Sequence, residues 1–439
     1  MQVQHADCQP CTLHINAIHR TIQTASLANQ LSETDPTNPP THEDTRVTKG
    51  VQRHPITKGV ELMSSPSRRL SLAAKVSETP DTFRFRTADG LHSPDEFRAA
   101  ELLLLETLWD QSLGDLLGVQ ANYGVIGTVL DSVAATVTMT ETSARAVRLA
   151  RENVDRNDCS ATVVLVTSPS QLQSSFDTAC YAPEPYTPLD VGKQQLADAL
   201  STLRSGGRLY VAGRKSSGID RYEQFLGEHA SEVETVCRED GFRVIETTRP
   251  ESVDVPAVVL PKTITARVDD VPLSMVTKPG LFSPNSLDDG TRFLLEAATV
   301  EDGERVLDLA CGYGPVGAYA AARTDVDVVL TDENRRATDC AKATLAATGV
   351  EGRVVTADRL RGVDGEFDRV LCNPPTHAGN GVLSRLFSGV CDVLRNDGEL
   401  SVVHHRTLNL DEHLELVGKI TDRQTSNEHT VLTVRPGPN

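Results

Sequence analysis

The chain has 439 residues, of which 39% are hydrophobic and 24% charged, and its formal net charge is −18. This length predicts two to four domains of about 100–200 residues each, and the ordinary glycine and proline content excludes a collagen-like or wholly disordered protein. The sequence contains no run of about 18 apolar residues that would span a bilayer, and its first twenty residues lack the apolar core of a secretion signal. We therefore expect a cytoplasmic protein that does not bind membranes.

The cysteine and lysine contents carry further information. The nine cysteines are odd in number and irregularly spaced, which argues against a disulfide framework and favours a reducing compartment. Only nine of the 43 basic residues are lysine, and acidic, lysine-poor sequences are typical of proteins from salt-loving cells. We predict a halophile-like acidic protein that does not attract polyanions through a general basic surface.

Residues 1–80 are rich in polar residues and proline and show no sustained periodicity, so we predict a disordered polar tail, with Met63 as an alternative start. Within it, Cys8 and Cys11 precede His14 and His19. Their spacing does not match that of a common zinc finger, and we predict no metal site.

An internal repeat indicates that the rest of the chain consists of two similar domains. Four landmarks recur at an offset of 190 or 191 residues. They are Ala121-Asn-Tyr-Gly-Val-Ile-Gly127 with Cys311-Gly-Tyr-Gly-Pro-Val-Gly317, Thr140-Glu141 with Thr331-Asp332, Phe176-Asp177 with Phe367-Asp368, and Leu203-Arg-Ser-Gly-Gly207 with Leu394-Arg-Asn-Asp-Gly398. We predict one domain over residues 81–260 and a second over residues 261–439.

Each half alternates short β-branched runs with helical patterns, which predicts an α/β fold with doubly wound, mostly parallel sheets. A hairpin is expected at Ile264–Thr277, where the halves join, and Pro315 is expected in the first turn of a helix. One buried helix face is predicted from the spacing of Leu383, Leu386, Phe387, Val390 and Leu394. The strands expected in the second half are Arg305–Ala310, Asp327–Thr331, Arg353–Ala357, Asp368–Cys372 and Glu399–Val403.

A glycine turn follows the first of these strands. Gly312 and Gly314 would let the backbone approach a bound cofactor closely, and the following helix N-terminus offers free N–H groups. Asp308 precedes the turn. Gly312, Gly314 and Gly317 also satisfy the dinucleotide fingerprint, so this motif does not separate NAD from another adenosine cofactor.

Two further carboxylates follow the next two strands. Asp332 comes twenty residues after Gly312, where a carboxylate can accept hydrogen bonds from both ribose hydroxyls. Asp358 comes just after the strand that ends at Ala357, and it is a candidate acceptor for an adenine amino group. A helix cap or a solvated loop residue is the alternative interpretation of Asp358.

The segment Asn373-Pro374-Pro375 lies at the carboxyl end of the fourth predicted strand, where ligands bind in such sheets. Two consecutive prolines stiffen this turn. The Asn373 side-chain oxygen and the Pro374 carbonyl would then form two fixed acceptors for the hydrogens of a planar NH₂ group.

On these residues the second half resembles class I S-adenosylmethionine-dependent methyltransferases that act on amino groups, whose motif is Asn/Asp-Pro-Pro followed by an aromatic residue. More narrowly, the chain resembles the two-domain small-subunit ribosomal RNA guanine-N2 methyltransferases, whose first domain has lost its cofactor site. The family's Pro-Gly-x-Phe-Ser and Leu-Asp-x-Gly segments stand here as Pro279-Gly-Leu-Phe282-Ser283 and Leu287-Asp-Asp-Gly290. The resemblance implies two Rossmann-like domains, S-adenosyl-L-methionine as the cofactor, and ribosomal RNA or the small ribosomal subunit as the partner.

The resemblance also assigns roles to residues. Asp308 and the Gly312–Gly314 turn would surround the methionine portion of the cofactor, Asp332 the ribose and Asp358 the adenine. Phe282 would lie against the cofactor pocket. Asn373, Pro374 and Pro375 would orient the target nitrogen, and Thr376 and His377 would contact the base.

Thr376 departs from the family, which has an aromatic ring there that stacks on the flipped base. Stacking of this kind is worth about 1–3 kcal/mol, so another group such as His377 must supply it, or the substrate differs. Candidates for further RNA contacts are Arg214, Lys215, His404, His405 and Arg406. The alternative interpretation of each is a solvated charge in a loop.

The same positions predict that the first domain is inactive. Asp308 corresponds to Gly118, Gly312 to Asn122 and Asn373 to Ala182. Two alternatives to rRNA methylation stay open: methylation of a protein glutamine, and a non-catalytic RNA-binding factor for ribosome assembly.

Overall fold

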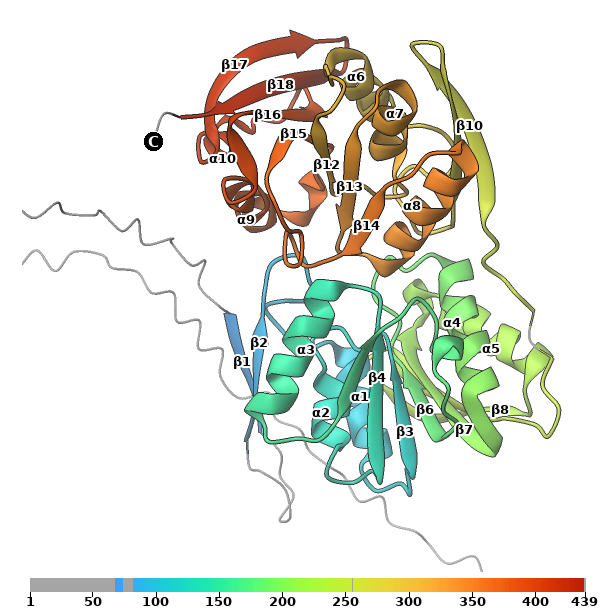
Figure 1. The fold of residues 1–439 in the computed structure, drawn as a ribbon. Helices are drawn as coiled ribbons and strands as arrows, with labels where there is room; N and C mark the ends of the chain where they lie inside the picture. The colour runs from blue at the N-terminus through green and yellow to red at the C-terminus, as the bar shows by residue number, and fades with distance from the viewer. Residues whose placement is uncertain (1–67, 74–81, 255, 438–439) are drawn as a thin grey trace, which may run out of the picture.

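The computed structural model describes residues 68–73, 82–254 and 256–437. They fold into two α/β units of one design, which lie one above the other in Figure 1. Residues 1–67 and 74–80 of the predicted tail, and with them the prediction made for Cys8 and Cys11, lie outside the described residues.

The first unit contains nine strands, five α-helices and two short 3₁₀ turns within the described ranges. They are β1 (Arg68–Ala73), β2 (Thr82–Thr87), α1 (Ala99–Leu108), β3 (Asp115–Val119), α2 (Val125–Leu130), β4 (Thr136–Glu141), α3 (Ala144–Arg156), β5 (Thr162–Leu165), η1 (Pro169–Gln171), β6 (Phe176–Tyr181), α4 (Leu189–Thr202), β7 (Leu203–Arg214), η2 (Lys215–Ser217), α5 (Ile219–His229), β8 (Val233–Glu239) and β9 (Phe242–Thr248).

The second unit repeats this order and begins with a hairpin of its own. Its elements are β10 (Lys262–Val268), β11 (Val271–Thr277), α6 (Asp289–Ala297), β12 (Arg305–Leu309), α7 (Pro315–Arg323), β13 (Asp327–Asp332), α8 (Arg335–Thr348), β14 (Arg353–Thr356), β15 (Phe367–Cys372), η3 (Thr376–Ala378), α9 (Asn380–Val390), β16 (Leu394–His405), α10 (Asp411–Leu414), β17 (Gly418–Thr425) and β18 (His429–Pro436).

Both main sheets have seven strands in equivalent orders, β5-β4-β3-β6-β7-β9-β8 and β14-β13-β12-β15-β16-β18-β17. The first five strands of each order are parallel, and the last two are antiparallel additions. The β12 side chains are buried on both faces, since helices cover the sheet on each side and two apolar clusters flank it. The predicted α/β, doubly wound class is confirmed.

The predicted strands of the second unit are present, and four of the five differ from the prediction by one residue at one end. Strand β16 is longer than predicted and runs from Leu394 to His405. Helix α9 ends at Val390, so the assignment of Leu394 to that helix face was wrong, although Leu394 is buried in the same apolar cluster. Pro315 occupies the first turn of α7 as predicted.

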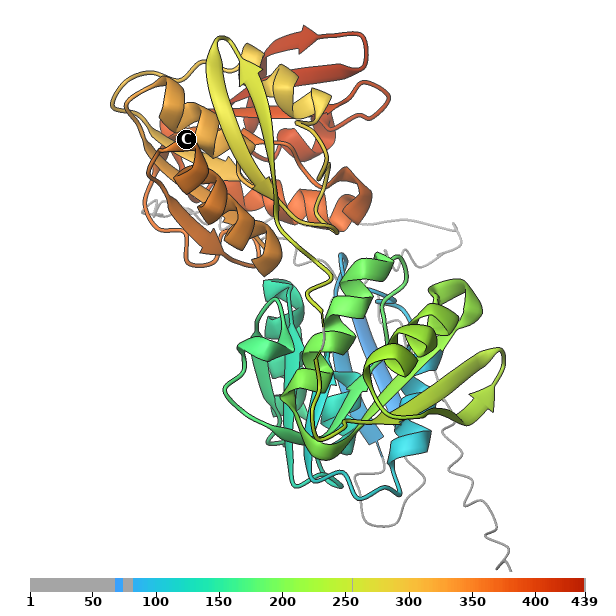
Figure 2. The same ribbon diagram turned by 90° about the vertical axis from the view of Figure 1, so that its right-hand side faces the viewer.

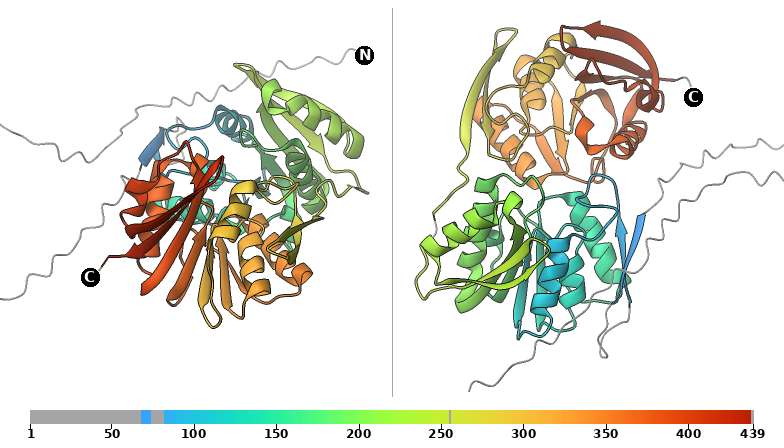
Figure 3. Two further views of the ribbon diagram at one scale, coloured as in Figure 1. Left: turned by 90° about the horizontal axis from the view of Figure 1, so that it is seen from above. Right: turned by 180° about the vertical axis from the view of Figure 1, so that it is seen from behind.

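A β-hairpin precedes each main sheet, and Figure 3 shows the two from behind, with β1–β2 in blue and β10–β11 in yellow. Each hairpin packs on the equivalent helix. Asn153 of α3 accepts the Arg86 N–H, and Thr344 of α8 accepts the Val276 N–H. Strand β1 therefore corrects the predicted extent of the disordered tail, because Arg68–Ala73 pair in register with β2.

The two units are connected by the extended segment before β10 and meet through the carboxyl ends of their strands (Figure 2). The loop after β4 pairs with the loop after β13. Ala144 N donates to Glu333 O and Arg335 N donates to Thr142 O, both over 2.8 Å. Because Thr142 and Glu333 are equivalent positions of the repeat, as are Ala144 and Arg335, this contact has approximate two-fold symmetry. We keep the domain boundary near residue 260 as a proposal.

Candidate functional site

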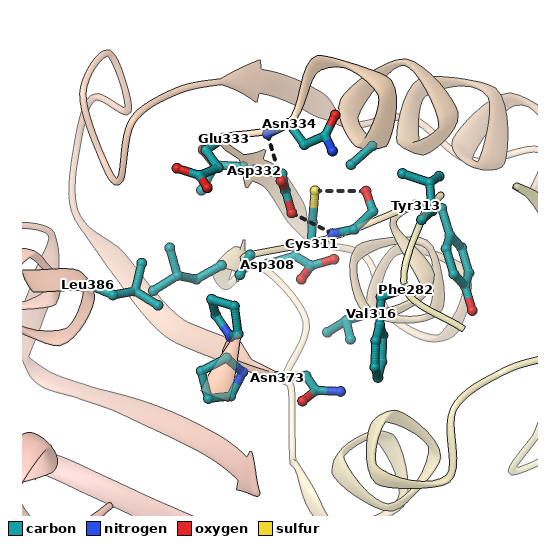
Figure 4. A pocket seen from close by; sticks show the side chains of 18 of the residues that line it. Phe282, Asp308, Cys311, Tyr313, Val316, Asp332, Glu333, Asn334, Asn373 and Leu386 are labelled. Atoms are coloured by element: carbon teal, nitrogen blue, oxygen red, sulfur yellow. Dashed lines mark hydrogen bonds between the residues drawn. The ribbon is translucent and has the colours of Figure 1, made fainter. Parts of the chain in front are cut away.

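A cavity of about 360 Å³ opens at the carboxyl ends of β12, β13 and β15 in the second unit (Figure 4). The chain leaves β12 toward β13 on one side and reaches β15 on the other, so the cavity lies at the point where strand order reverses. Nine of the predicted site residues line it: Phe282, Asp308, Gly312, Asp332, Asn373, Pro374, Pro375, Thr376 and His377.

The two glycines of the turn, Gly312 and Gly314, have different surroundings. Gly312 has φ +55°, and nothing would lie within 4 Å of a Cβ there, so its missing side chain leaves the cavity open. Gly314 does not line the cavity. It has φ +82° at the N-cap of α7, and a Cβ would crowd Leu330 and Ala341, so a glycine at this position allows close packing of α7. Its contact with a cofactor stays a prediction.

Asp332 is held by backbone N–H groups on both carboxylate oxygens. Oδ2 accepts from Gly312 N over 3.0 Å and Oδ1 accepts from Asn334 N over 2.8 Å, as the dashed lines in Figure 4 show. Burial raises the pKa of Asp332, and these bonds oppose the shift. The remaining lone pairs of the two oxygens can accept from two neighbouring hydroxyl groups.

Asp308 is 1% exposed. Its Oδ2 accepts from Gly317 N over 2.8 Å. Burial raises the pKa of Asp308 to about 7, against the opposing effect of that N–H. The neighbouring Asp332 carboxylate raises this pKa as well. A cationic ligand in the cavity would favour the ionised form of Asp308.

Asn373 is oriented by helix α6. Its Nδ2 donates to Thr291 Oγ1 over 2.9 Å and to Asp288 Oδ2 over 3.2 Å. Asp288 is also the N-cap of α6 and accepts from Thr291 N. Because an ionised carboxylate only accepts, the NH₂ end of the Asn373 amide must face α6, which leaves Oδ1 as the free acceptor.

The two prolines fix the next turn. Pro375 has φ −75° and ψ 74°, the geometry of an inverse γ-turn, and the Pro374 carbonyl accepts from Thr376 N over 2.8 Å. A carbonyl oxygen has two lone pairs, so Pro374 keeps one for a ligand. Asn373 and Pro374 thus place two acceptors at one wall of the cavity.

Asp358 is the second predicted site residue that does not line the cavity. Its carboxylate accepts from Arg145 Nε over 3.2 Å and from Arg148 Nε over 2.8 Å, and both arginines belong to α3 of the first unit. Burial raises its pKa, but these guanidinium groups lower it more, so the net pKa lies below the ordinary value. The carboxylate expected at the adenine is therefore engaged in an ion pair between the units.

The aromatic and basic candidates have mixed outcomes. Phe282 lines the cavity and is 61% exposed, so its ring is available at the cavity mouth. Thr376 and His377 lie in η3 and also line the cavity. His404, predicted as an RNA contact, is only 4% exposed, which corrects that prediction, whereas Arg406 is exposed.

Sequence reasoning missed several residues at the cavity. Thr291 and Glu333 line it, and so does Arg145, which comes from the other unit. The spacing of Asp288 and Thr291 is that of a helix N-cap, a signal that was present in the sequence. Nothing local to Arg145 indicates its position.

In the first unit the equivalent positions are closed by side chains. Asn122 has φ +50° and donates N–H to Glu141, as Gly312 does to Asp332, but its side chain is buried and donates to His92 O over 2.9 Å. The Ala182 and Pro183 carbonyls accept from Arg98. In the first unit, the Asn122 side chain thus occupies the position that Gly312 leaves open, and Arg98 engages the carbonyls at the positions of Asn373 and Pro374.

Two absences hold for the described residues alone. Within residues 68–73, 82–254 and 256–437, no group of three or more His, Cys, Asp or Glu side chains is arranged to hold a metal ion. None of the helices in these ranges is long and apolar enough to cross a membrane.

Known proteins resemble this chain in sequence. Ribosomal RNA small subunit methyltransferase C of Salmonella newport is 32% identical over 214 residues, which cover 48% of this chain and 61% of that protein. The protein of the same name from Pseudomonas entomophila is 31% identical over 227 residues, 50% of this chain and 68% of that protein. The first match thus spans less than two thirds of its relative's length.

A solved structure resembles the whole fold. It is a T. thermophilus 16S rRNA N2 methyltransferase in complex with AdoMet and guanosine, with a TM-score of 0.69 and 24% sequence identity over 80% of this chain and 95% of that one. The methyltransferase small domain profile matches residues 82–246 and 272–433, once in each unit. The resemblance inferred from the motifs is confirmed, and the chain belongs to the methyltransferase small domain family.

Proposed function

We propose that this chain is an S-adenosylmethionine-dependent methyltransferase that modifies the exocyclic N2 amino group of guanine in ribosomal RNA of the small subunit. The observation that carries the proposal is the orientation of Asn373. Its NH₂ group is held by Thr291 and Asp288, so Oδ1 is left as an acceptor in the cavity that also contains Asp308 and Asp332. The names of the relatives and of the solved neighbour support the same activity.

The residues present fit the cofactor. Asp332 would hold the ribose hydroxyls, Asp308 would face the cationic methionine portion, and the open space at Gly312 would admit the ligand close to the backbone. When bound, S-adenosylmethionine supplies an activated methyl group on its sulfonium. Asp358 is not included, since its carboxylate is bound by Arg145 and Arg148.

The chemistry of this chain's own residues is positioning and electrostatic. A guanine amino group is a weak nucleophile because its lone pair is delocalised into the ring. Acceptance of its two hydrogens by Asn373 Oδ1 and the Pro374 carbonyl would favour a pyramidal nitrogen with an exposed lone pair. Transfer would form an N–C bond and break the S–C bond of the sulfonium, leaving S-adenosylhomocysteine and a positively charged nitrogen that loses one proton to solvent. A base in a duplex must be flipped out to reach the cavity.

The first unit would not transfer methyl groups, because Ala182 stands at the position of Asn373 and Arg98 engages the Ala182 and Pro183 carbonyls. We also propose a cytoplasmic location, where the small ribosomal subunit is assembled. The seven cysteines in the described part of the chain are all free, which supports a reducing compartment.

Incubation of the purified chain with S-adenosylmethionine and small ribosomal subunits tests the proposal. Mass spectrometry of the digested RNA should detect N2-methylguanosine. Methylation of a ribosomal protein glutamine instead would contradict the RNA substrate, and absence of any transfer from naked RNA and from assembled subunits would favour a non-catalytic assembly factor.

A further inference from the structure

Arg145 of the first unit reaches into the second unit at the edge of the cavity. Arg145 is 7% exposed. It is the second residue of α3, directly after the loop that pairs with the second unit. Nη2 lies 2.8 Å from Glu333 Oε2, and Nε donates to Asp358 Oδ1 over 3.2 Å. The same side chain lines the cavity.

Arg145 thereby joins two separate loops that bound one end of the cavity. Glu333 follows Asp332 at the end of β13 (Figure 4), and Asp358 follows β14 between Ala357 and Arg359, which both line the cavity. The Asp358 side chain is buried and the Glu333 side chain is partly exposed. The two carboxylates repel each other, so one guanidinium that pairs with both stabilises the two loops in this arrangement.

The first unit is shaped to bring the guanidinium there. Nη1 of Arg145 donates to Asp89 O over 3.3 Å, and Gly90 has φ +85° at a position where a Cβ would overlap that nitrogen. Gly90 therefore leaves the space that the arginine occupies.

The repeat shows that this pairing is built in one direction only. The equivalent of Arg145 in the second unit is Arg336, but the equivalents of Glu333 and Asp358 in the first unit are the uncharged Thr142 and Thr167. The two carboxylates that pair with an arginine of the other unit therefore lie beside the cavity of the second unit, and the equivalent site in the first unit has none.

We propose that Arg145 is a positioning residue of the cofactor site, supplied by the domain that has lost its own site. It holds the Glu333 and Asp358 loops at the cavity edge, so the first domain contributes directly to cofactor affinity. This inference rests on the proposed function, because it names a residue that shapes the same S-adenosylmethionine site.

Arg148 provides a matched control. It donates Nε to the other oxygen of Asp358 over 2.8 Å and pairs with Glu152, but it does not line the cavity or contact Glu333. Replacement of either arginine removes one interaction between the units at the same carboxylate. Only replacement of Arg145 removes the guanidinium partner of the Glu333 side chain, while the backbone bonds Ala144 N–Glu333 O and Arg335 N–Thr142 O remain in both variants.

The test uses the full chain and compares Arg145→Met, Arg145→Lys and Arg148→Met by calorimetric titration with S-adenosylmethionine and by thermal unfolding. Arg145→Met should weaken S-adenosylmethionine binding about tenfold and raise the KM for S-adenosylmethionine without lowering kcat. Arg148→Met should lower Tm by a similar amount but leave the affinity and the KM for S-adenosylmethionine at their wild-type values. Arg145→Lys should fall between, because one ammonium cannot bridge both carboxylates in the same geometry.

Equal affinity of Arg145→Met and the unaltered protein would overturn the inference and leave the proposed function intact. Equal losses in Arg145→Met and Arg148→Met would overturn it as well, since interface stability alone would then explain the effect. Failure of the unaltered protein to bind S-adenosylmethionine would contradict the proposed function and the inference together.

Discussion

Asn373 Nδ2 donates to Thr291 Oγ1 over 2.9 Å, and this bond determines which end of the Asn373 amide faces the cavity. The Thr291 hydroxyl itself donates to Asp288 Oδ2, so its oxygen is available to accept. Helix α6 thus fixes the orientation of a side chain that belongs to the loop after β15.

Thr291→Val should lower kcat about tenfold and leave S-adenosylmethionine affinity unchanged. Valine has the same shape but cannot accept a hydrogen bond, so only Asp288 would hold the Asn373 amide, and alignment of the acceptor would suffer. Single-turnover methylation and calorimetric titration measure the two quantities. Thr291→Ser keeps the hydroxyl and should retain most of the rate; an equal loss in both variants would indicate a packing effect.

Gly312→Asn should reproduce the closed form of the first domain. Asn122 adopts φ +50° at the equivalent position, and asparagine tolerates this conformation, so the variant should fold with little change in Tm. Its side chain would fill the cavity and weaken S-adenosylmethionine binding by about a hundredfold, or about 3 kcal/mol. Unchanged affinity would show that the cavity at Gly312 does not admit the ligand.

Asp308→Asn should stabilise the protein above pH 7 and weaken cofactor binding. The pKa of Asp308 is about 7 in the folded protein and near 3.8 otherwise, so the native state binds more protons between these values and stability falls as pH rises through them. Asparagine keeps an acceptor for Gly317 N–H and removes the buried charge, for a gain of about 1–4 kcal/mol at pH 8.

Denaturant unfolding at pH 5 and pH 8 measures this effect. The stability difference between Asp308→Asn and the unaltered protein should be larger at pH 8. A difference that is independent of pH would mean that Asp308 is ionised throughout this range.

Much of the architecture was predictable because it depends on local patterns. The recurrence of Gly124 and Gly127 at Gly314 and Gly317 indicated two equivalent units, and buried β-branched runs such as Asp327–Thr331 marked the parallel strands. Asn373 and Asp332 line one cavity because both lie at the carboxyl ends of strands that share one edge of the sheet. Strand β1 was missed because it is short and separated from the rest by a polar stretch.

The contacts between the units could not be predicted in this way. No sequence pattern marks Arg145 and Arg148 as contacts, and Asp358 was interpreted as an adenine acceptor, a helix cap or a solvated loop residue. Only the approximate two-fold pairing of the β4 and β13 loops brings α3 to Asp358, 213 residues away in sequence. The packing role of Gly314 was likewise not foreseen, since a sequence does not tell a glycine that leaves space for a ligand from one that admits a neighbouring helix.

The central claim is that Asn373 and the Pro374 carbonyl clamp an NH₂ group in the second domain while other residues bind the cofactor. Asn373→Ala tests it most directly, with calorimetric titration of S-adenosylmethionine and methyl transfer to small ribosomal subunits measured on one preparation. The structure predicts unchanged cofactor affinity and a loss of transfer of at least about a hundredfold. Full transfer by the Asn373→Ala protein would contradict the account.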